Sequence, residues 1–243
     1  VIKQALIESR IKNQESRIMN QTILEEDVDA IAVTYGPGLI GSLLVGVETA
    51  KTLSYTFNKP LIPVNHLLAH IYANFIRSNE VTNNEPEVQF PAIALVVSGG
   101  HTELYLMKSI KELKWLGGTL DDAAGEAFDK TARLLGFENR GGIAIQEAAE
   151  KYSSSDPPAG GESRSFNGKF STSSNNIKLP RPLLRDETFN FSFSGLKTAV
   201  MREWNKIIID YTLDPKPYPL ISAFAHEIQE AITDVLVSKT IKA

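Results

Sequence analysis

The stretch DAIAVTYGPGLIGSLLVGVETAKTLSYTFNKPLIPV, residues 29–64, decides the fold. It starts with an apolar run at 29–36, passes through a glycine turn into a long helical pattern, and ends in a second apolar run at 61–64. A strand, a helix and a second strand in this order form a right-handed unit with parallel strands. The sequence therefore predicts an α/β fold.

Two histidines four residues apart, His66 and His70, follow in the stretch LIPVNHLLAHIYANFI. This spacing places both imidazoles on one face of a helix, where they can bind one metal ion. The apolar positions lie on the opposite face: Leu67, Leu68, Ile71 and Phe75. Unrelated histidines with this spacing are also common on solvated helices. The zinc-protease signature is absent, because Leu67 stands where that signature has its glutamate.

The chain changes character after a polar stretch at residues 81–90, which we take as a boundary between two lobes, 1–90 and 91–243. Residues 91–107 hold two apolar runs joined at Ser98-Gly99-Gly100-His101. They predict a hairpin whose glycines adopt positive φ. Residues 153–176 are polar and rich in glycine and serine, which indicates a flexible loop.

Periodicity and end signals predict the remaining elements. They are a helix over 1–14, a helix over 122–135 capped by Asp121 or Asp122 and ended by Gly136, a helix in 141–152, a strand at 189–195, and helices over 196–209 and 218–241.

The composition excludes several classes of protein. At 243 residues, 42% hydrophobic and 22% charged, the chain can bury a core, and the absence of cysteine excludes disulfides and thiolate metal sites. A net charge of −4 argues against nucleic-acid binding without a local basic patch or a basic partner. No stretch has the apolar length of a membrane span and the start does not resemble a signal peptide, so we expect a cytoplasmic protein.

Several polar motifs each allow a chemical and a purely structural interpretation. The glycine hairpin can bring backbone donors to a phosphate, or it can be a plain turn. Asp129 can bind a ribose hydroxyl, or it can belong to a solvated helix face. Gly142 can bring the backbone near a purine, or it can belong to a turn. The stretch SFSGLK, residues 192–197, carries no chemistry by itself.

Five motifs in this order closely resemble the TsaD family, which installs the threonylcarbamoyl group on adenosine of transfer RNA. They are GPGLIGSLLVG, NHLLAH, VVSGGHTELYL, DDAAGEAFDKTARLLG and NFSFSGLKTAV. The resemblance covers most of the chain outside residues 153–176, and the histidine and threonine after the glycine pair are similar to the bacterial and organellar branch. It implies a two-lobed fold of the actin, sugar kinase and Hsp70 type.

The resemblance also implies roles for individual residues. His66 and His70 would be metal ligands, Asp129 would lie at the ribose and Gly142 beside the adenosine. The residues expected to line the adenylate pocket are Val96, Val97, Ser98, Gly99 and Gly100. The ligand would be one divalent metal ion, with iron or zinc suited to two histidines and one carboxylate.

The implied reaction is attack by the exocyclic amine of an adenosine, next to the anticodon in tRNAs that read ANN codons, on threonylcarbamoyl adenylate. AMP leaves. The expected partners are this adenylate, tRNA and helper proteins similar to TsaB and TsaE, with a homodimer as a further option and no membrane. A mitochondrial or plastid location is the alternative to the cytoplasm.

The chain also departs from the family pattern. Its opening phosphate loop, its late nucleotide motif and the C-terminal aspartate of the metal site are missing, which indicates an internal fragment incomplete at both ends and inactive by itself. Asn139-Arg140 precedes the double glycine where relatives have proline. Two alternatives stay open, a metallopeptidase of the glycoprotease type and a nucleotide-binding scaffold without turnover.

Overall fold

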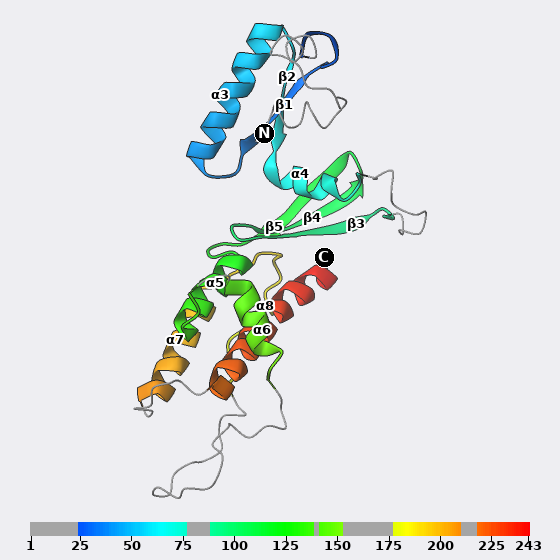
Figure 1. Cartoon of the computed structure of the whole chain (residues 1–243). Coiled ribbons are helices and arrows are strands. Elements are labelled where there is room, and N and C mark those ends of the chain that lie inside the picture. The colour runs from blue at the N-terminus through cyan, green and yellow to red at the C-terminus, as the bar shows by residue number, and fades with distance from the viewer. Residues whose placement is uncertain (1–23, 77–87, 139–140, 153–176, 210–217) are drawn as a thin grey trace, which may run out of the picture. The chain divides into compact units, whose positions relative to one another are not determined.

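The computed structural model describes residues 24–76, 88–138, 141–152, 177–209 and 218–243. The chain divides into two compact units, unit 1 (Val1–Asn84) and unit 2 (Glu85–Ala243). Both combine helices with a small sheet, which confirms a mixed α/β fold (Figure 1). No helix of the described ranges has both the length and the apolar character needed to span a membrane.

Several predictions concern residues outside the described ranges. These are the helix over 1–14, most of the polar stretch 81–90, the dipeptide Asn139-Arg140 and the loop 153–176. The assignment of 1–90 and 91–243 to two lobes stays a prediction.

Unit 1 contains the strand–helix–strand segment that the sequence predicts. Its elements are β1 (Ile31–Gly36), α3 (Ile40–Phe57), β2 (Leu61–Asn65) and α4 (His66–Ala73). The strands pair in parallel, with Ile31 opposite Leu61, as predicted. Helix α3 ends at Asn58, whose left-handed backbone (φ 50°) lets its N–H donate to the Ser54 carbonyl. Asparagine tolerates this conformation at a helix end.

Unit 2 is built on an antiparallel sheet in the order β3–β4–β5. Strands β3 (Ala92–Val97) and β4 (Thr102–Ser109) form the predicted hairpin. Strand β5 (Glu112–Gly118) is absent from the sequence prediction. A bulge explains this, because Leu104 pairs with Gly117 and Tyr105 with Trp115, so Leu116 is the extra residue that breaks the alternation of side chains.

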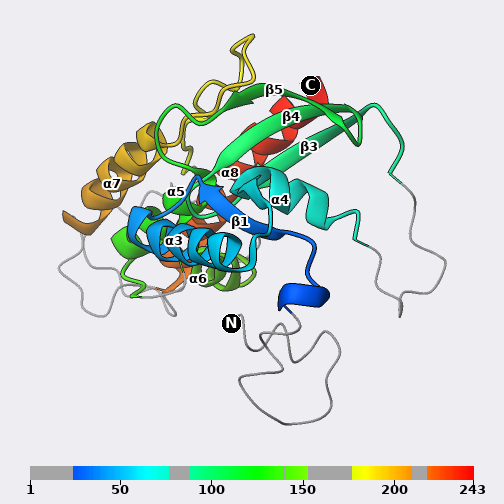
Figure 2. The same cartoon turned by 90° about the horizontal axis from the view of Figure 1, so that it is seen from above.

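Four helices gather on one face of this sheet, as Figures 1 and 2 show. They are α5 (Ala124–Leu135), α6 (Gly141–Ala149), α7 (Ser194–Ile209) and α8 (Tyr218–Lys242). All four predicted helices are confirmed. Gly136 ends α5 with φ 96°, and its N–H donates to the carbonyls of the last turn, as predicted.

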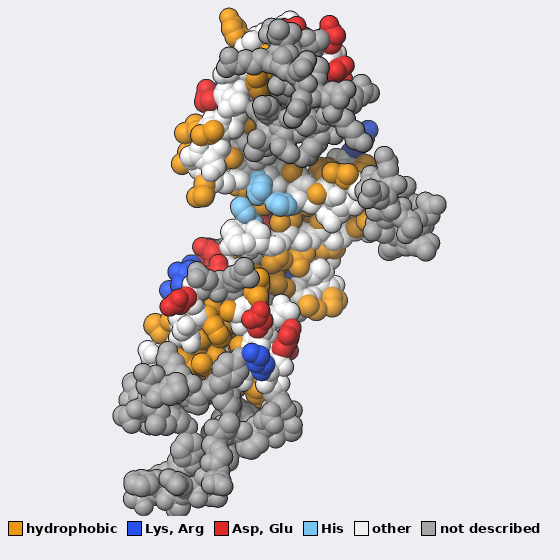
Figure 3. Space-filling view, in the orientation of Figure 1, with side chains coloured by type: hydrophobic (Ala, Val, Ile, Leu, Met, Phe, Trp, Pro, Cys, Tyr) orange, Lys and Arg blue, Asp and Glu red, His pale blue; other side chains and the backbone are white. Residues whose placement is uncertain are grey.

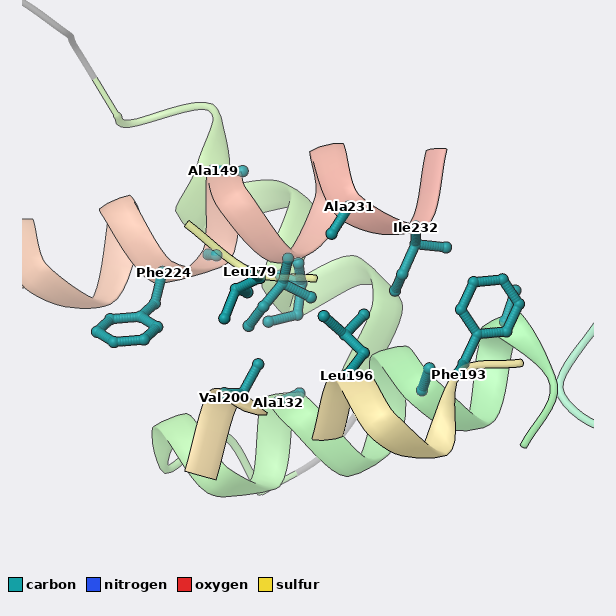
Figure 4. Close-up of a cluster of buried hydrophobic side chains, with 14 of the residues drawn as sticks. Ala132, Ala149, Leu179, Phe193, Leu196, Val200, Phe224, Ala231 and Ile232 are labelled. Carbon is teal, nitrogen blue, oxygen red and sulfur yellow. The ribbon is translucent and has the colours of Figure 1, made fainter. Parts of the chain in front are cut away.

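The helices and the sheet enclose one hydrophobic cluster, part of which Figure 4 shows. Leu104 contributes from β4, while Leu196 and Val200 of α7 lie between α5 and α8 with Phe224 of α8. These side chains are fully buried. Burial of each one stabilises the fold by about 1.5–3 kcal/mol relative to leaving it exposed.

The predicted strand at 189–195 is wrong. Only Phe191 forms an isolated bridge, to Thr119, and α7 begins already at Ser194. The alternating phenylalanines that suggested a strand, Phe191 and Phe193, are instead both buried in the helical core. Alternation therefore reports burial here and not a regular strand.

The predicted cap of α5 is also wrong. Neither Asp121 nor Asp122 caps this helix, because its N-cap position is Ala123. The Glu126 carboxylate accepts a hydrogen bond from the Ala123 N–H at 3.2 Å and satisfies one free donor of the first turn. The Asp122 carboxylate instead forms an ion pair with Lys130.

Candidate functional site

The turn between β3 and β4 is closed by Ser98. Its N–H donates to the His101 carbonyl at 2.8 Å, and its hydroxyl accepts from the His101 N–H at 3.1 Å. The prediction of positive φ at the glycines is wrong, since neither Gly99 nor Gly100 lies in the left-handed region. The side-chain hydroxyl closes the turn in place of a left-handed glycine.

Packing against the described residues does not explain why glycine occupies these two positions either. A Cβ atom added at Gly99 or Gly100 would meet no atom within 4 Å, and both residues are exposed. No described residue accepts a hydrogen bond from either amide. Two successive free amides on an open turn are the arrangement that binds anions through the backbone.

Helix α5 supports this turn from behind. The Gly125 N–H donates to the Ser98 carbonyl at 3.2 Å, and a Cβ at Gly125 would lie 2.6 Å from that oxygen and 2.7 Å from the Gly99 Cα. One residue earlier, the Ala124 N–H donates to the buried hydroxyl of Thr102 at 2.9 Å. Sequence reasoning missed Gly125 and Thr102. The glycine inside the predicted helix was the available signal for a close backbone approach.

Asp129 and the double glycine lie close together in the structure. A Cβ at Gly141 would lie 2.4 Å from the Asp129 Cα, so the start of α6 contacts α5 here. At Gly142 the nearest atom to an added Cβ is the Phe128 Cβ, at 4.0 Å. Gly141 is therefore needed for helix packing, while Gly142 and the exposed Asp129 remain accessible to a ligand.

Asp121 joins two of the sequence motifs. Its carboxylate accepts hydrogen bonds from the hydroxyls of Ser192 and Ser194, both at 2.6 Å, and from the N–H groups of Phe193 and Ser194 at 2.8 and 3.2 Å. Partial burial alone would raise the pKa of Asp121, but these bonds lower that pKa to about 2. Asp121 thus caps the start of α7 from a distant part of the chain. The two serines around the start of that helix were the signal for such a cap.

The histidine pair in unit 1 is positioned by a helix cap. The Asn65 side chain accepts from the N–H groups of Leu67 and Leu68 at 2.9 and 3.2 Å, so α4 begins at His66. Leu67 and Ile71 are buried on the opposite face, as predicted.

The geometry of the two rings fits a shared metal ion. Their Nε2 atoms lie 3.3 Å apart, with the ring planes inclined at 76°. Two nitrogen ligands of a tetrahedral zinc ion, each at about 2.0–2.1 Å, are separated by about 3.3–3.4 Å. The described residues contain no group of three or more histidines and carboxylates that could complete such a site. His66 and His70 therefore fit as two ligands of an ion that needs further ones.

These features define a class, the mixed α/β proteins in which a helix-backed hairpin presents free glycine amides. Residues 8–243 match the TsaD family, described as tRNA N6-adenosine threonylcarbamoyltransferase. A protein of that name from Persephonella marina is 47% identical over 221 residues, covering 90% of this chain and 53% of the relative. Its namesake from Syntrophomonas wolfei is 48% identical over 216 residues, covering 89% and 54%.

A third protein of that name, from a Sulfurihydrogenibium species, is 46% identical over 231 residues, covering 94% of this chain and 57% of the relative. The chain belongs to the TsaD family. It spans about half the length of the curated relatives it matches.

Proposed function

We propose that the protein containing this chain transfers the threonylcarbamoyl group from threonylcarbamoyl adenylate to the exocyclic amine of the adenosine next to the anticodon, in tRNAs that read ANN codons. The membership of the TsaD family and the names of its relatives support this proposal. The observation that carries it on this chain is the pair of free amides at Gly99 and Gly100, which suits the adenylate phosphate.

Unit 2 would bind the nucleotide part of the donor. In this proposal the phosphate lies against the turn Ser98–Gly100 at the end of β3, whose last residues, Val96 and Val97, line the pocket. Asp129 accepts a hydrogen bond from the ribose, and Gly142 leaves room for the purine ring. The hydroxyl and amide contacts behind the turn hold it rigid, so binding does not have to order it.

The reaction breaks one bond and forms another at the carbonyl carbon of the donor. The adenosine nitrogen forms the new C–N bond, the C–O bond to the phosphate breaks, and the amine loses a proton. AMP leaves with the bonding electrons. Backbone donors at Gly99 and Gly100 favour this departure because they stabilise negative charge on the phosphate.

Unit 1 would hold a divalent metal, iron or zinc, through His66 and His70. Their Nε2 separation and their imidazole nitrogen donors fit such an ion. When bound, the ion supplies Lewis-acid polarisation of a donor oxygen. The histidines themselves fix its place on α4, because Asn65 sets the start of that helix.

Membership of the same family supports further proposals about the fold, the partners and the location of the protein. We infer a two-lobed fold of the actin, sugar kinase and Hsp70 type for the protein, with unit 1 and unit 2 in the two lobes. We also infer helper proteins similar to TsaB and TsaE, a homodimer as an alternative assembly, and a cytoplasmic location. The presence of tRNA-modifying enzymes of this name in bacteria supports the location.

The test is a transfer assay with the complete gene product, threonylcarbamoyl adenylate, unmodified tRNA and both helper proteins. We expect N6-threonylcarbamoyladenosine in the digested tRNA. If the donor and tRNA both bind but no modified nucleoside forms, the protein is a nucleotide-binding scaffold. Metal-dependent cleavage of a protein substrate that His66→Ala abolishes would instead support the metallopeptidase.

A further inference from the structure

We propose that the exposed face of α7 binds the phosphate backbone of the RNA substrate. This inference rests on the proposed function, which supplies the RNA partner. Helix α7 carries three basic residues, Lys197, Arg202 and Lys206, and all three are exposed. Its one acid, Glu203, forms an ion pair with Lys206 at 2.8 Å. The helix is therefore a net positive surface in a chain of net charge −4.

The orientation of α7 is fixed by its other face. Leu196, Val200 and Trp204 are buried in the core of unit 2, at the helical spacing of one apolar stripe. By helix geometry Arg202 and Lys206 lie on the side away from this stripe and Lys197 lies at its edge, and all three are exposed. Between them along the helix lies Asn205, which is exposed and can donate hydrogen bonds to phosphate oxygens.

The start of α7 is linked to the nucleotide hairpin. Asp121 holds Ser192, Phe193 and Ser194 through its carboxylate. Three residues after Asp121, α5 begins, and its Gly125 contacts the turn at Ser98. RNA bound along α7 would thus be held at a fixed position relative to a donor bound at the hairpin.

A second exposed cluster of similar charge, in the described part of unit 2, serves as a control. Lys108, Lys111 and Lys114 lie around the turn between β4 and β5, and Lys108 forms an ion pair with Glu112 at 2.7 Å. This turn lies at the opposite end of β4 from the hairpin, a separation of about 25 Å for a strand of that length. Over the helices of unit 2 in Figure 3, the visible Lys and Arg side chains lie beside Asp and Glu side chains.

The experiment measures tRNA affinity of the complete gene product at several salt concentrations. It compares the wild type, the triple variant K197A/R202A/K206A and the charge-matched triple variant K108A/K111A/K114A. We expect the α7 variant to lose affinity by about tenfold or more, and its salt slope to fall by roughly two to three. The control variant should stay within about twofold of wild type, because its charges lie outside the proposed surface and salt screens the long-range effect of exposed charges.

Two further measurements distinguish a loss of tRNA binding at this surface from misfolding and from a loss of nucleotide binding. Thermal melting and AMP affinity should match the wild type in both variants, since exposed substitutions of this kind change stability little. Wild-type affinity and slope in the α7 variant, or an equal loss in the control, would overturn the proposal. If the α7 variant loses tRNA affinity and the wild type transfers no threonylcarbamoyl group, the proposed RNA-binding surface is supported and the proposed function is rejected.

Discussion

Two glycines occupy the same position in their helices but have opposite surroundings. Gly125 is the second residue of α5, and Gly195 is the second residue of α7. A Cβ at Gly125 would collide with the backbone of Ser98 and Gly99, whereas a Cβ at Gly195 would meet nothing within 4 Å. Only the first glycine is therefore required by the packing of the structure.

Gly125→Ala should displace the turn at Ser98 and weaken nucleotide binding. Because the obstructing atoms are backbone, relief requires movement of the turn or of α5, with an expected loss of about 1–3 kcal/mol of unfolding free energy. Urea denaturation and calorimetry with AMP measure the two effects. Gly195→Ala is the matched control and should match or slightly exceed the wild-type stability. Equal behaviour of the two variants would contradict the assigned contact.

Asp121→Asn should lower stability at neutral pH, because the amide nitrogen cannot accept the hydrogen bonds that the second carboxylate oxygen receives from Ser192 and Ser194. Hydrogen bonds to a charged group contribute about 1.5–3 kcal/mol. The folded pKa of Asp121 is about 2, below the unfolded value of about 3.9. The stabilisation is thus fully present above pH 3.9 and is lost as the pH falls toward 2.

Urea denaturation of the wild type and Asp121→Asn at pH 6 and pH 3 tests this dependence. The difference in unfolding free energy between the two proteins should be smaller at the lower pH. Glu147→Gln, on the exposed side of α6, is the control and should match the wild type at both values. A difference that does not change with pH would argue against the capping role.

At the scale of elements, one buried hydroxyl joins β4 to α5. The Thr102 side chain is fully buried, and its oxygen accepts from the Ala124 N–H at 2.9 Å. The neighbouring Thr119 N–H donates to the Thr102 carbonyl at 2.9 Å, so the end of β5 is attached at the same place. The hairpin and the helix behind it are therefore held by few, well-defined bonds.

Thr102→Val should destabilise unit 2 by about 1–3 kcal/mol, because it leaves the buried Ala124 N–H without an acceptor. Thr102→Ser keeps the oxygen and loses only a methyl group, so it should cost less, about 1 kcal/mol. Chemical denaturation of the two variants beside the wild type gives the comparison. If the serine variant were the less stable one, packing of the methyl group and not the hydrogen bond would dominate.

Periodicity predicted the parallel pair β1–β2, the β3–β4 hairpin and the four helices in the described part of unit 2. It failed where a tertiary contact replaced a local rule. The bulge at Leu116 hid β5, and the burial of Phe191 and Phe193 imitated a strand. Likewise Asp121, placed next to α5 in the sequence, caps α7. Contacts between residues about 70 positions apart leave no local pattern.

At the scale of the whole molecule, unit 1 carries the histidine pair and unit 2 carries the glycine turn. The histidine pair could be located from its spacing, and the glycine turn from its composition. The contact partners of Gly125 and Gly141 could not, because these contacts arise only when α5 meets the turn and α6. For Gly125 the sequence offered one signal, a glycine inside a predicted helix. Sequence reasoning proposed residues that would contact ligands, but it missed residues that support the turn, such as Gly125 and Thr102.

His66→Ala and His70→Ala should each abolish stable metal binding by the protein, because each removes one of two convergent nitrogen donors. Metal content after equilibration with iron or zinc and dialysis measures this directly. His226→Ala is the control, since that ring packs against Tyr152 at 4.7 Å between centroids and belongs to unit 2. Unchanged metal content in the α4 variants would remove these histidines from the site.

The most direct test of the proposed function is the rate of N6-threonylcarbamoyladenosine formation in tRNA, with donor adenylate and helper proteins present. The wild-type gene product and Gly195→Ala should form it at similar rates, and Gly125→Ala should be slower by an order of magnitude, about 1.4 kcal/mol of activation free energy. No product from the wild type, or equal rates for all three proteins, would contradict a nucleotide site at the turn behind which Gly125 lies.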